Sequence, residues 1–269
     1  MQHRHSLAIV DSDLPMPLIT RPALRTEQVV AFGGMSTRAA KMRSTLASLA
    51  RLAETDANLL VEGETGVGKE LAAESVHRGS ARQAGPFIVF DCAAQSVQAG
   101  ERELFGAEEE QSGMLGSLEL AAGGTVLLDH IDELALPLQV RLLRALERRE
   151  IRRVGGKQNI AVDVRVIAAC SRALRREVRL GTFKRELYML VCTECVRIPA
   201  LRQRLEDLTP LAQEILTSFQ PQRELHDIPD HVWAAFRAYP WPGNVRELRN
   251  ALQRAVMMPD RALRFARGL

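Results

Sequence analysis

The sequence lacks any apolar run long enough to cross a membrane. A spanning helix needs about 20 apolar residues, and no run of eighteen occurs in the 269 residues. The amino-terminal stretch from Met1 to His5 and onward also lacks the apolar block of a secretory signal. We therefore expect a cytoplasmic protein that does not contact a membrane.

The chain also lacks an excess of either charge. Its 36 basic and 33 acidic residues are mixed throughout, and the formal net charge is +3. Bulk charge of this kind does not indicate nucleic-acid binding. The arginine-rich segment 136–149 is amphipathic, which favours a solvated or subunit-facing surface over a nucleic-acid site.

Cysteine is scarce, with four residues at positions 92, 170, 192 and 195. The last two form a CxxC sequence, which can be a redox motif or half of a zinc site. No second pair and no nearby histidine accompanies it. We expect a strand over 191–198, on which residues three apart face opposite sides, and we favour partly buried thiols over a metal site.

The feature that stands out is a glycine-rich stretch directly after the apolar residues 58–61. Its spacing fits GxxxxGK, in which the backbone N–H groups cradle phosphates and the lysine reaches the terminal ones. Glu70 stands where a generic P-loop has a hydroxyl that binds magnesium. Either the site is weakened or a family with a different metal arrangement is indicated. The predicted nucleotide-binding residues are Gly63, Glu64, Thr65, Gly66, Val67, Gly68, Lys69 and Glu70.

Apolar periodicity predicts strands that alternate with helices, which is typical of an α/β fold with a parallel sheet between helices. The expected strands are 58–62, 86–91, 123–129, 162–169 and 191–198, and the expected helices are 36–53, 69–79, 101–110, 136–149, 172–180 and 183–190. After Pro199 only helices are expected, at 207–219, 230–238 and 242–258. The predicted parts are a tail or linker over 1–30, an α/β nucleotide-binding core over 31–199 and a helical lid over 200–269.

One buried strand ends in an acid. Asp129 follows the apolar residues 126–128, so it lies at the carboxyl end of a strand in the predicted parallel sheet. In a P-loop protein an acid at this position holds Mg²⁺ through water. We predict that role for Asp129.

Several motifs together resemble the AAA+ domain of sigma-54-dependent transcriptional activators. The resemblance covers roughly residues 30–258 and implies a P-loop AAA+ core with a small helical lid. It also implies ATP or ADP with Mg²⁺, and a ring that remodels the sigma-54 RNA polymerase holoenzyme. The family's P-loop normally ends in GKE, which accounts for Glu70, and Arg246 matches the lid arginine that senses the terminal phosphate. The motifs are GETGVGKE (63–70), PFIVFDCAA (86–94), ELFG (103–106), LELAAGGTVLLD (118–129), RRVGG (152–156), DVRVIAA (163–169), LRQRLEDL (201–208) and WPGNVRELRN (241–250).

The sequence departs from the family at the hydrolytic positions. His130 replaces the glutamate that polarises the attacking water, Asp91 replaces its asparagine switch partner, and Ser171 replaces the sensor asparagine. A histidine is a possible base, but its ring has a different reach, and losing a general base costs roughly 10²- to 10⁴-fold in rate. Asp91 and His130 either form a compatible pair or have drifted independently at an unused site.

The trans-acting arginine fingers and the sigma-54 contact loop are also altered. The fingers align with Lys184, a weak substitute because an ammonium lacks the guanidinium fork, and with Leu190, which carries no charge. Arg185 fits only after a one-residue shift. Residues 107–116 replace the family's GAFTGA loop with a shorter, acidic segment. A productive grip on sigma-54 is therefore not expected.

Two functions fit these observations. The favoured one is an ATP-binding, hydrolysis-impaired regulatory module, a pseudo-ATPase that acts in transcription regulation through protein contacts. Those contacts include self-association or association with a related AAA+ activator. The alternative is an active ATPase that remodels the sigma-54 holoenzyme. Direct DNA binding is not expected for this chain.

Overall fold

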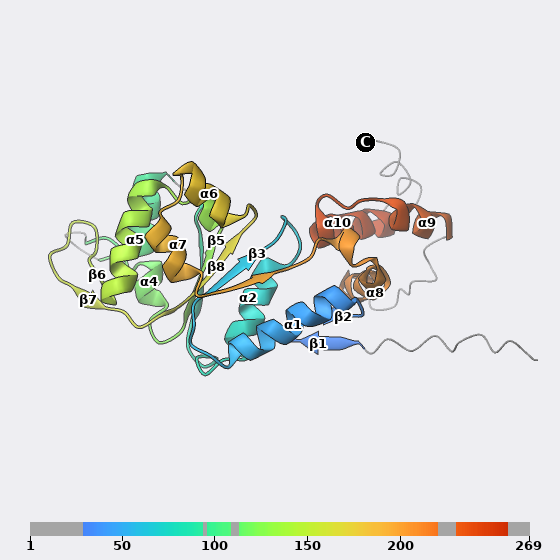
Figure 1. Ribbon diagram of the computed structural model, residues 1–269, viewed down its shortest axis with the longest axis horizontal. Coiled ribbons are helices and arrows are strands. Elements are labelled where there is room, and N and C mark those ends of the chain that lie inside the picture. Colours follow the sequence, from blue (N-terminus) through green and yellow to red (C-terminus); the bar gives the residue numbers. More distant parts are fainter. Residues whose placement is uncertain (1–28, 94–95, 109–112, 220–229, 258–269) are drawn as a thin grey trace, which may run out of the picture.

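A five-stranded parallel sheet forms the centre of the molecule. The computed structural model describes residues 29–93, 96–108, 113–219 and 230–257. The strand order is β4-β5-β8-β3-β9, and every neighbouring pair is parallel. The predicted parallel sheet, followed by a helical region, is confirmed (Figure 1). The strands are β3 (Leu59–Glu62), β4 (Phe87–Asp91), β5 (Thr125–Asp129), β8 (Arg165–Cys170) and β9 (Glu194–Arg197).

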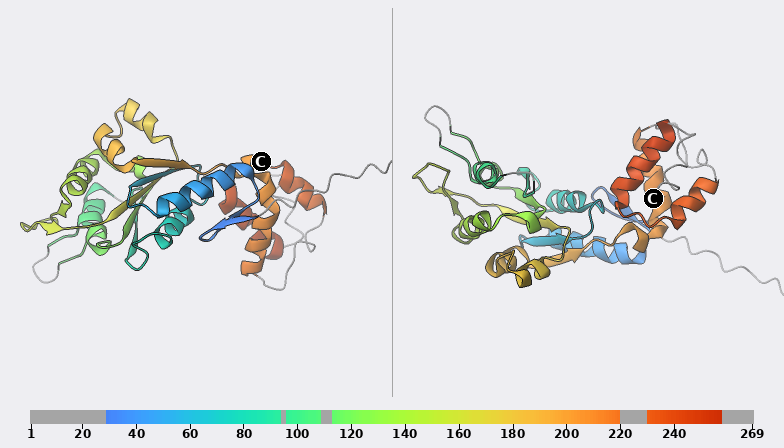
Figure 2. Two further views of the ribbon diagram at one scale, coloured as in Figure 1. Left: turned by 60° about the horizontal axis from the view of Figure 1, so that its bottom comes forward. Right: turned by 90° about the horizontal axis from the view of Figure 1, so that it is seen from above.

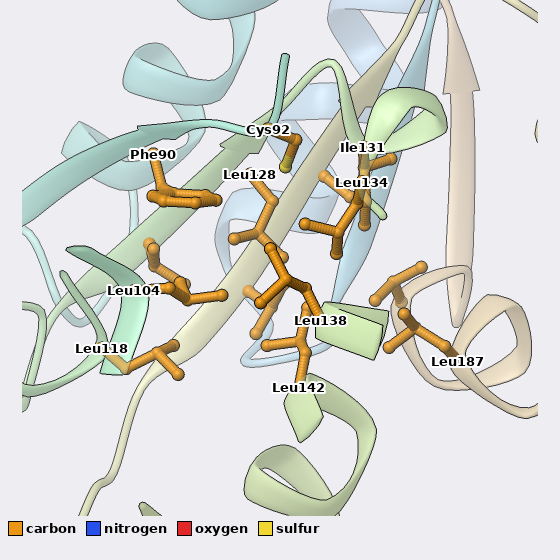
Figure 3. Packing of buried hydrophobic residues seen from close by; sticks show 14 of the residues in the cluster. Phe90, Cys92, Leu104, Leu118, Leu128, Ile131, Leu134, Leu138, Leu142 and Leu187 are labelled. Carbon is orange, nitrogen blue, oxygen red and sulfur yellow. The ribbon is translucent and has the colours of Figure 1, made fainter. Parts of the chain in front are cut away.

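Helices cover both faces of the sheet because its strands are apolar on both sides. Along β3, Leu59 and Val61 face one helical layer, and Leu60 faces the other. The first layer is α1 (Ala40–Ala53) and α2 (Lys69–Arg78). The second is α3 (Val97–Phe105), α4 (Ser117–Leu120), α5 (Leu136–Arg148), α6 (Leu174–Leu180) and α7 (Arg185–Val191). Figure 3 shows leucines of this second layer packed around Phe90 and Leu128.

The carboxyl-terminal helices have an apolar core of their own. They are α8 (Leu208–Phe219), α9 (Asp230–Ala238) and α10 (Asn244–Met257), and they lie beyond one end of the sheet (Figure 2). Trp241 is fully buried among them, and its ring meets those of Phe236 and Tyr239 edge to face. The 3₁₀ turns η2 (Leu201–Gln203) and η3 (Leu205–Asp207) lead from β9 into this unit.

The start of the described chain differs from the prediction. A hairpin is formed by β1 (Val30–Phe32) and β2 (Met35–Thr37), and its second strand extends into the helix expected from 36, so α1 begins only at Ala40. The backbone N–H groups of Arg38 and Ala39 donate to Asp207, which keeps this segment out of the helix. Nearly all of the predicted tail, 1–30, lies outside the described residues.

Other boundaries moved as well. The helix expected over 101–110 is α3, which starts earlier and ends at Phe105, where Gly106, with φ of 80°, caps it. The expected helix end falls on residues 109–112, outside the described ranges. A second hairpin, β6 (Glu150–Ile151) with β7 (Ile160–Ala161), and the one-turn helix α4 were not predicted, because two to four residues carry no period.

The prediction for the CxxC pair was wrong in its local structure. Cys192 ends α7, where its N–H donates to the carbonyl of Tyr188, and β9 begins only at Glu194. The two thiols therefore belong to different elements. All four cysteines are free, and the described residues contain no group of three or more side chains suited to hold a metal.

None of the described helices is both long and apolar enough to cross a bilayer.

Candidate nucleotide-binding site

The P-loop joins β3 to α2 at the carboxyl edge of the sheet, where parallel α/β folds place their ligands. Gly66 and Gly68 have φ values of 80° and 103°, a region that favours glycine. A Cβ on Gly68 would meet nothing within 4 Å, so backbone conformation rather than space requires glycine there. Gly68 caps α2 without a side-chain hydrogen bond. The amino-terminal N–H groups of this helix are thereby suited to a phosphate.

Lys69 lies across the mouth of the loop. Its Nζ donates to the carbonyls of Gly63 (2.9 Å) and Glu64 (3.3 Å) and to the Ser171 hydroxyl (3.0 Å). Burial lowers the pKa of Lys69, and the charge of Asp129 opposes this shift. The predicted lysine and sensor serine are thus brought together, and a phosphate would be a stronger acceptor for the ammonium than these neutral oxygens.

Strand register explains why two acidic residues lie side by side at this edge of the sheet. Asp91 and Asp129 are paired positions of β4 and β5, so the two carboxylates end neighbouring strands. Asp129 Oδ1 accepts from the N–H of His130 (2.9 Å), and its side chain is one-fifth exposed. One carboxylate beside a phosphate site fits Mg²⁺, which keeps several waters and takes few protein ligands. Glu70 is exposed in the first turn of α2.

His130 is turned toward Asp91. Its backbone is left-handed, with φ 51° and ψ 41°, and its Nδ1 lies 3.0 Å from Asp91 Oδ1 and 3.7 Å from Asp129 Oδ2. A carboxylate at Nδ1 favours the tautomer with the proton on that nitrogen. The two substituted residues are therefore in direct contact.

The predicted finger positions lie on α7. Lys184 caps its amino terminus, and its N–H donates to Gln139 Oε1 (2.8 Å). Leu190 is half-buried, packs against the core, and its carbonyl accepts from Asn58 Nδ2 (3.1 Å). Arg185 is exposed. Leu190 is thus part of the packing of its own chain.

The lid contacts the P-loop directly. The N–H groups of Val245 and Arg246 donate to Gly66 O at 3.0 and 3.3 Å. Arg202 forms a two-pronged ion pair with Glu64, at 2.5 and 2.7 Å. The charge of Arg246 is near enough to Lys69 to help lower its pKa, after the larger effect of burial.

Sequence reasoning missed the lid residues that hold the loop. Arg202 and Arg204 were noted only within the LRQRLEDL motif, and Asn244 only within the WPGNVRELRN motif. Their positions in these motifs are the one signal that pointed to them.

The segment predicted to replace the contact loop, residues 107–116, is described only in part. Ala107 and Met114 exchange backbone hydrogen bonds of 3.0 and 2.8 Å, and residues 109–112 lie outside the described ranges. The loss of the sigma-54 contact loop stays a prediction.

Two known protein families match this chain. The family described as the sigma-54 interaction domain matches residues 35–196, and the AAA+ ATPase lid domain matches residues 202–264. The chain belongs to the sigma-54 interaction domain family. The family resemblance seen in the sequence is thereby confirmed.

Relatives of this sigma-54 interaction domain are regulatory proteins. The Nif-specific regulatory protein of Enterobacter agglomerans is 43% identical over 239 residues, which are 86% of this chain and 46% of the relative. Regulatory protein AtoC of Escherichia coli K12 is 40% identical over 245 residues, 88% of this chain and 53% of the relative. The chain spans about half the length of these curated relatives.

A solved structure has the same fold. NtrX from Brucella abortus in complex with ATP superposes with a TM-score of 0.78 at 32% identity, over 84% of this chain and 53% of NtrX. A second structure of NtrX contains ADP and gives a TM-score of 0.76 at 31% identity, over 85% of this chain and 52% of NtrX.

Proposed function

We propose that this sigma-54 interaction domain is an ATP-binding module of transcription regulation that hydrolyses ATP slowly or not at all and acts through protein contacts. The observation that carries the proposal is the contact between His130 Nδ1 and Asp91 Oδ1 at 3.0 Å. It occupies the position where the family's catalytic glutamate and its switch partner would lie. An intact P-loop thus stands beside an altered hydrolytic centre.

Binding is supported by the loop itself. The left-handed glycines, the uncapped start of α2 and Lys69 form an anion site. NtrX, which shares the fold, has been solved with ATP and with ADP. In this chain residues 63–70 would hold the phosphates, Arg246 would approach them from the lid, and Asp129 would hold Mg²⁺ through water.

Impaired hydrolysis is supported by the residues that act on the terminal phosphate. His130 replaces a carboxylate base, and an arginine finger contributes roughly 10³-fold or more in rate. Lys184 offers an ammonium in place of a guanidinium, and Leu190 packs inward. Each loss alone raises the barrier by several kcal/mol, since tenfold in rate is about 1.4 kcal/mol.

The regulatory output would run through protein contacts, with a second copy of this chain or with a related AAA+ activator as partner. Light scattering on the chain alone, with ATP, and mixed with such an activator tests this part. We expect weak self-association, because Lys184 and Leu190 bridge poorly to a neighbour's phosphate. A stable ring formed by the chain alone would contradict it.

The nucleotide proposal is tested by titrating ATP into the wild type and into Lys69→Ala, with hydrolysis followed in the same samples. We expect binding by the wild type that is lost in Lys69→Ala, with little phosphate release. Ordinary turnover by the wild type would favour an active ATPase. Absence of ATP binding would overturn both functions.

A further inference from the structure

Lid residues donate hydrogen bonds to three successive backbone carbonyls of the P-loop. Thr65 O accepts from Asn244 Nδ2 (3.0 Å), and Val67 O accepts from Arg204 Nη2 (3.0 Å). Between them, Gly66 O accepts from two N–H groups at the start of α10. The outer side of the loop is therefore bonded by donors of the lid.

Asn244 is built into this contact. It is fully buried, and its backbone is left-handed, with φ of 54°. Its Oδ1 accepts from Leu201 N (2.8 Å), while its Nδ2 reaches both Thr65 O and Glu64 Oε2. One amide thus joins the entry of the lid, the start of α10 and the P-loop.

Arg204 lies between η2 and η3, where the chain enters the lid. It is 3% exposed, and its Nη1 lies 3.9 Å from the buried carboxylate of Asp207. Within the described part of the chain its Nε has no hydrogen-bond partner. A buried guanidinium is costly, and this one contributes a donor to a P-loop carbonyl.

The geometry of the peptide unit gives these contacts a consequence. In a trans peptide the C=O of one residue and the N–H of the next point in opposite directions, and no cis bond occurs among the described residues. Fixing Thr65 O toward the lid turns the N–H of Gly66 away from it, and fixing Val67 O does the same for Gly68. Those are N–H groups of the phosphate-binding loop.

We propose that Asn244 and Arg204 are positioning residues for phosphate binding, because they hold P-loop carbonyls outward so that the following N–H groups face the nucleotide. This inference rests on the proposed nucleotide binding. Neither residue needs to touch the ligand. It predicts that loss of these donors weakens the phosphate contacts specifically.

Asn244→Asp is the sharpest test. The carboxylate keeps an acceptor for Leu201 N but places a second acceptor opposite Thr65 O and Glu64. Asn250→Asp is the matched control, because it makes the same change on the exposed side of the same helix. Two probes are titrated into each protein: ATP, and inorganic tripolyphosphate, which has phosphates but no adenosine.

We expect Asn244→Asp to weaken both probes by a similar factor of roughly tenfold or more, since a lost hydrogen bond and an unpaired group each matter at this scale. Asn250→Asp should stay within about twofold of the wild type. Arg204→Lys, which keeps a charge near Asp207 but withdraws the Nη2 donor, should resemble Asn244→Asp. Thermal melts show which variants are folded, and Arg204→Lys carries the test if Asn244→Asp unfolds.

Other outcomes separate the possibilities. Unchanged affinity in a folded Asn244→Asp overturns the inference. So does a loss confined to ATP, because the effect would then act on adenosine. Unfolding of both variants would assign these residues to stability alone and also contradict it. If the wild type binds neither probe, the nucleotide proposal itself fails.

Discussion

Asp207 joins the hairpin segment to the lid through a fully buried carboxylate. It accepts from the Thr37 hydroxyl (2.7 Å) and from the N–H groups of Arg38 (2.7 Å) and Ala39 (3.1 Å). Arg204 supplies the nearest opposite charge. A buried charge is tolerated only with such partners, so this residue fixes how the start of α1 meets the lid.

Replacing it should therefore be costly. Asp207→Ala leaves buried donors and the Arg204 guanidinium without their partner, and we expect a loss of about 3 kcal/mol in the free energy of unfolding. Asp163→Ala is the control, because Asp163 pairs with Arg82 on the surface with its side chain 65% exposed, and should cost less than about 1 kcal/mol. Urea denaturation of both variants measures the difference. Equal effects would contradict this account of Asp207.

Thiol reactivity should separate the cysteines. Cys92 and Cys170 are buried, whereas Cys192 is half-buried and Cys195 is exposed. Although the residue as a whole is exposed, its thiol is partly desolvated, and this effect and the nearby Glu62 carboxylate raise the pKa of Cys195 to about 12, so little of it is thiolate at pH 8. We expect iodoacetamide at pH 8 to modify Cys192 first, as read by peptide mass spectrometry. Faster modification of Cys92 or Cys170 would show that the core opens more readily than its packing implies.

At the scale of elements, the lid lies directly against the P-loop at Gly66, whose carbonyl accepts from the N–H groups of Val245 and Arg246. A Cβ on Gly66 would lie 2.2 Å from the carbonyl oxygen of Gly243, and the φ of Gly66 is 80°. Gly181 has a similar φ of 75° but open space around its Cβ position. Comparing alanine substitutions at Gly66 and Gly181 therefore distinguishes the cost of backbone strain from the cost of a clash between lid and P-loop.

We expect Gly66→Ala to lower the melting temperature more than Gly181→Ala and to weaken ATP binding at least tenfold. Gly181→Ala should cost only the strain of a left-handed alanine, about 1 kcal/mol, and leave ATP affinity unchanged. Calorimetric melting and ATP titration measure both effects. Similar melting temperatures and ATP affinities of the two variants would mean that the lid can shift away from Gly66 at little cost in free energy.

The sequence was informative about elements wherever a long pattern exists. Helices α1, α2 and α5 have apolar residues at helical spacing over ten or more residues, and their positions were predicted to within a few residues. Hairpins β1–β2 and β6–β7 are too short for a pattern. Cys192 was misplaced because the end of α7 and the start of β9 together read as one alternating run.

For the whole molecule, the ion pair between Glu64 and Arg202 links core and lid. The hydrogen bonds that Arg202 donates to the Glu64 carboxylate are the main reason the pKa of Glu64 is lowered. A lowered carboxyl pKa contributes stability that is complete above the unfolded value, near 4.5, and is lost as the pH falls through the folded value. Acid should therefore loosen the lid.

We expect the unfolding free energy to fall between pH 6 and pH 3.5, and Glu64→Gln to reduce that fall. Both side chains are more than 40% exposed, so the reduction should not exceed about 1 kcal/mol. Urea denaturation at the two pH values measures it. An unchanged pH dependence in Glu64→Gln would show that this pair does not hold the lid.

Part of the site was also within reach of the sequence. The P-loop, Asp129 and the change at His130 are visible in single motifs, and parallel register then places Asp91 beside Asp129. The donors from Asn244 and Arg204 were not foreseen, because they depend on how the lid folds back over residues more than 130 positions away. Local patterns do not encode such contacts.

The central claim is that this domain holds ATP without turning it over efficiently, and steady-state hydrolysis by the wild type and by His130→Glu tests it most directly. At saturating ATP and Mg²⁺ we predict a wild-type turnover far below about 1 per second, the low end of typical enzymes. His130→Glu should raise the rate about tenfold or more by restoring a base, although the finger positions still limit it. Wild-type turnover of about 1 per second or faster, or a lower rate in His130→Glu, would contradict the claim.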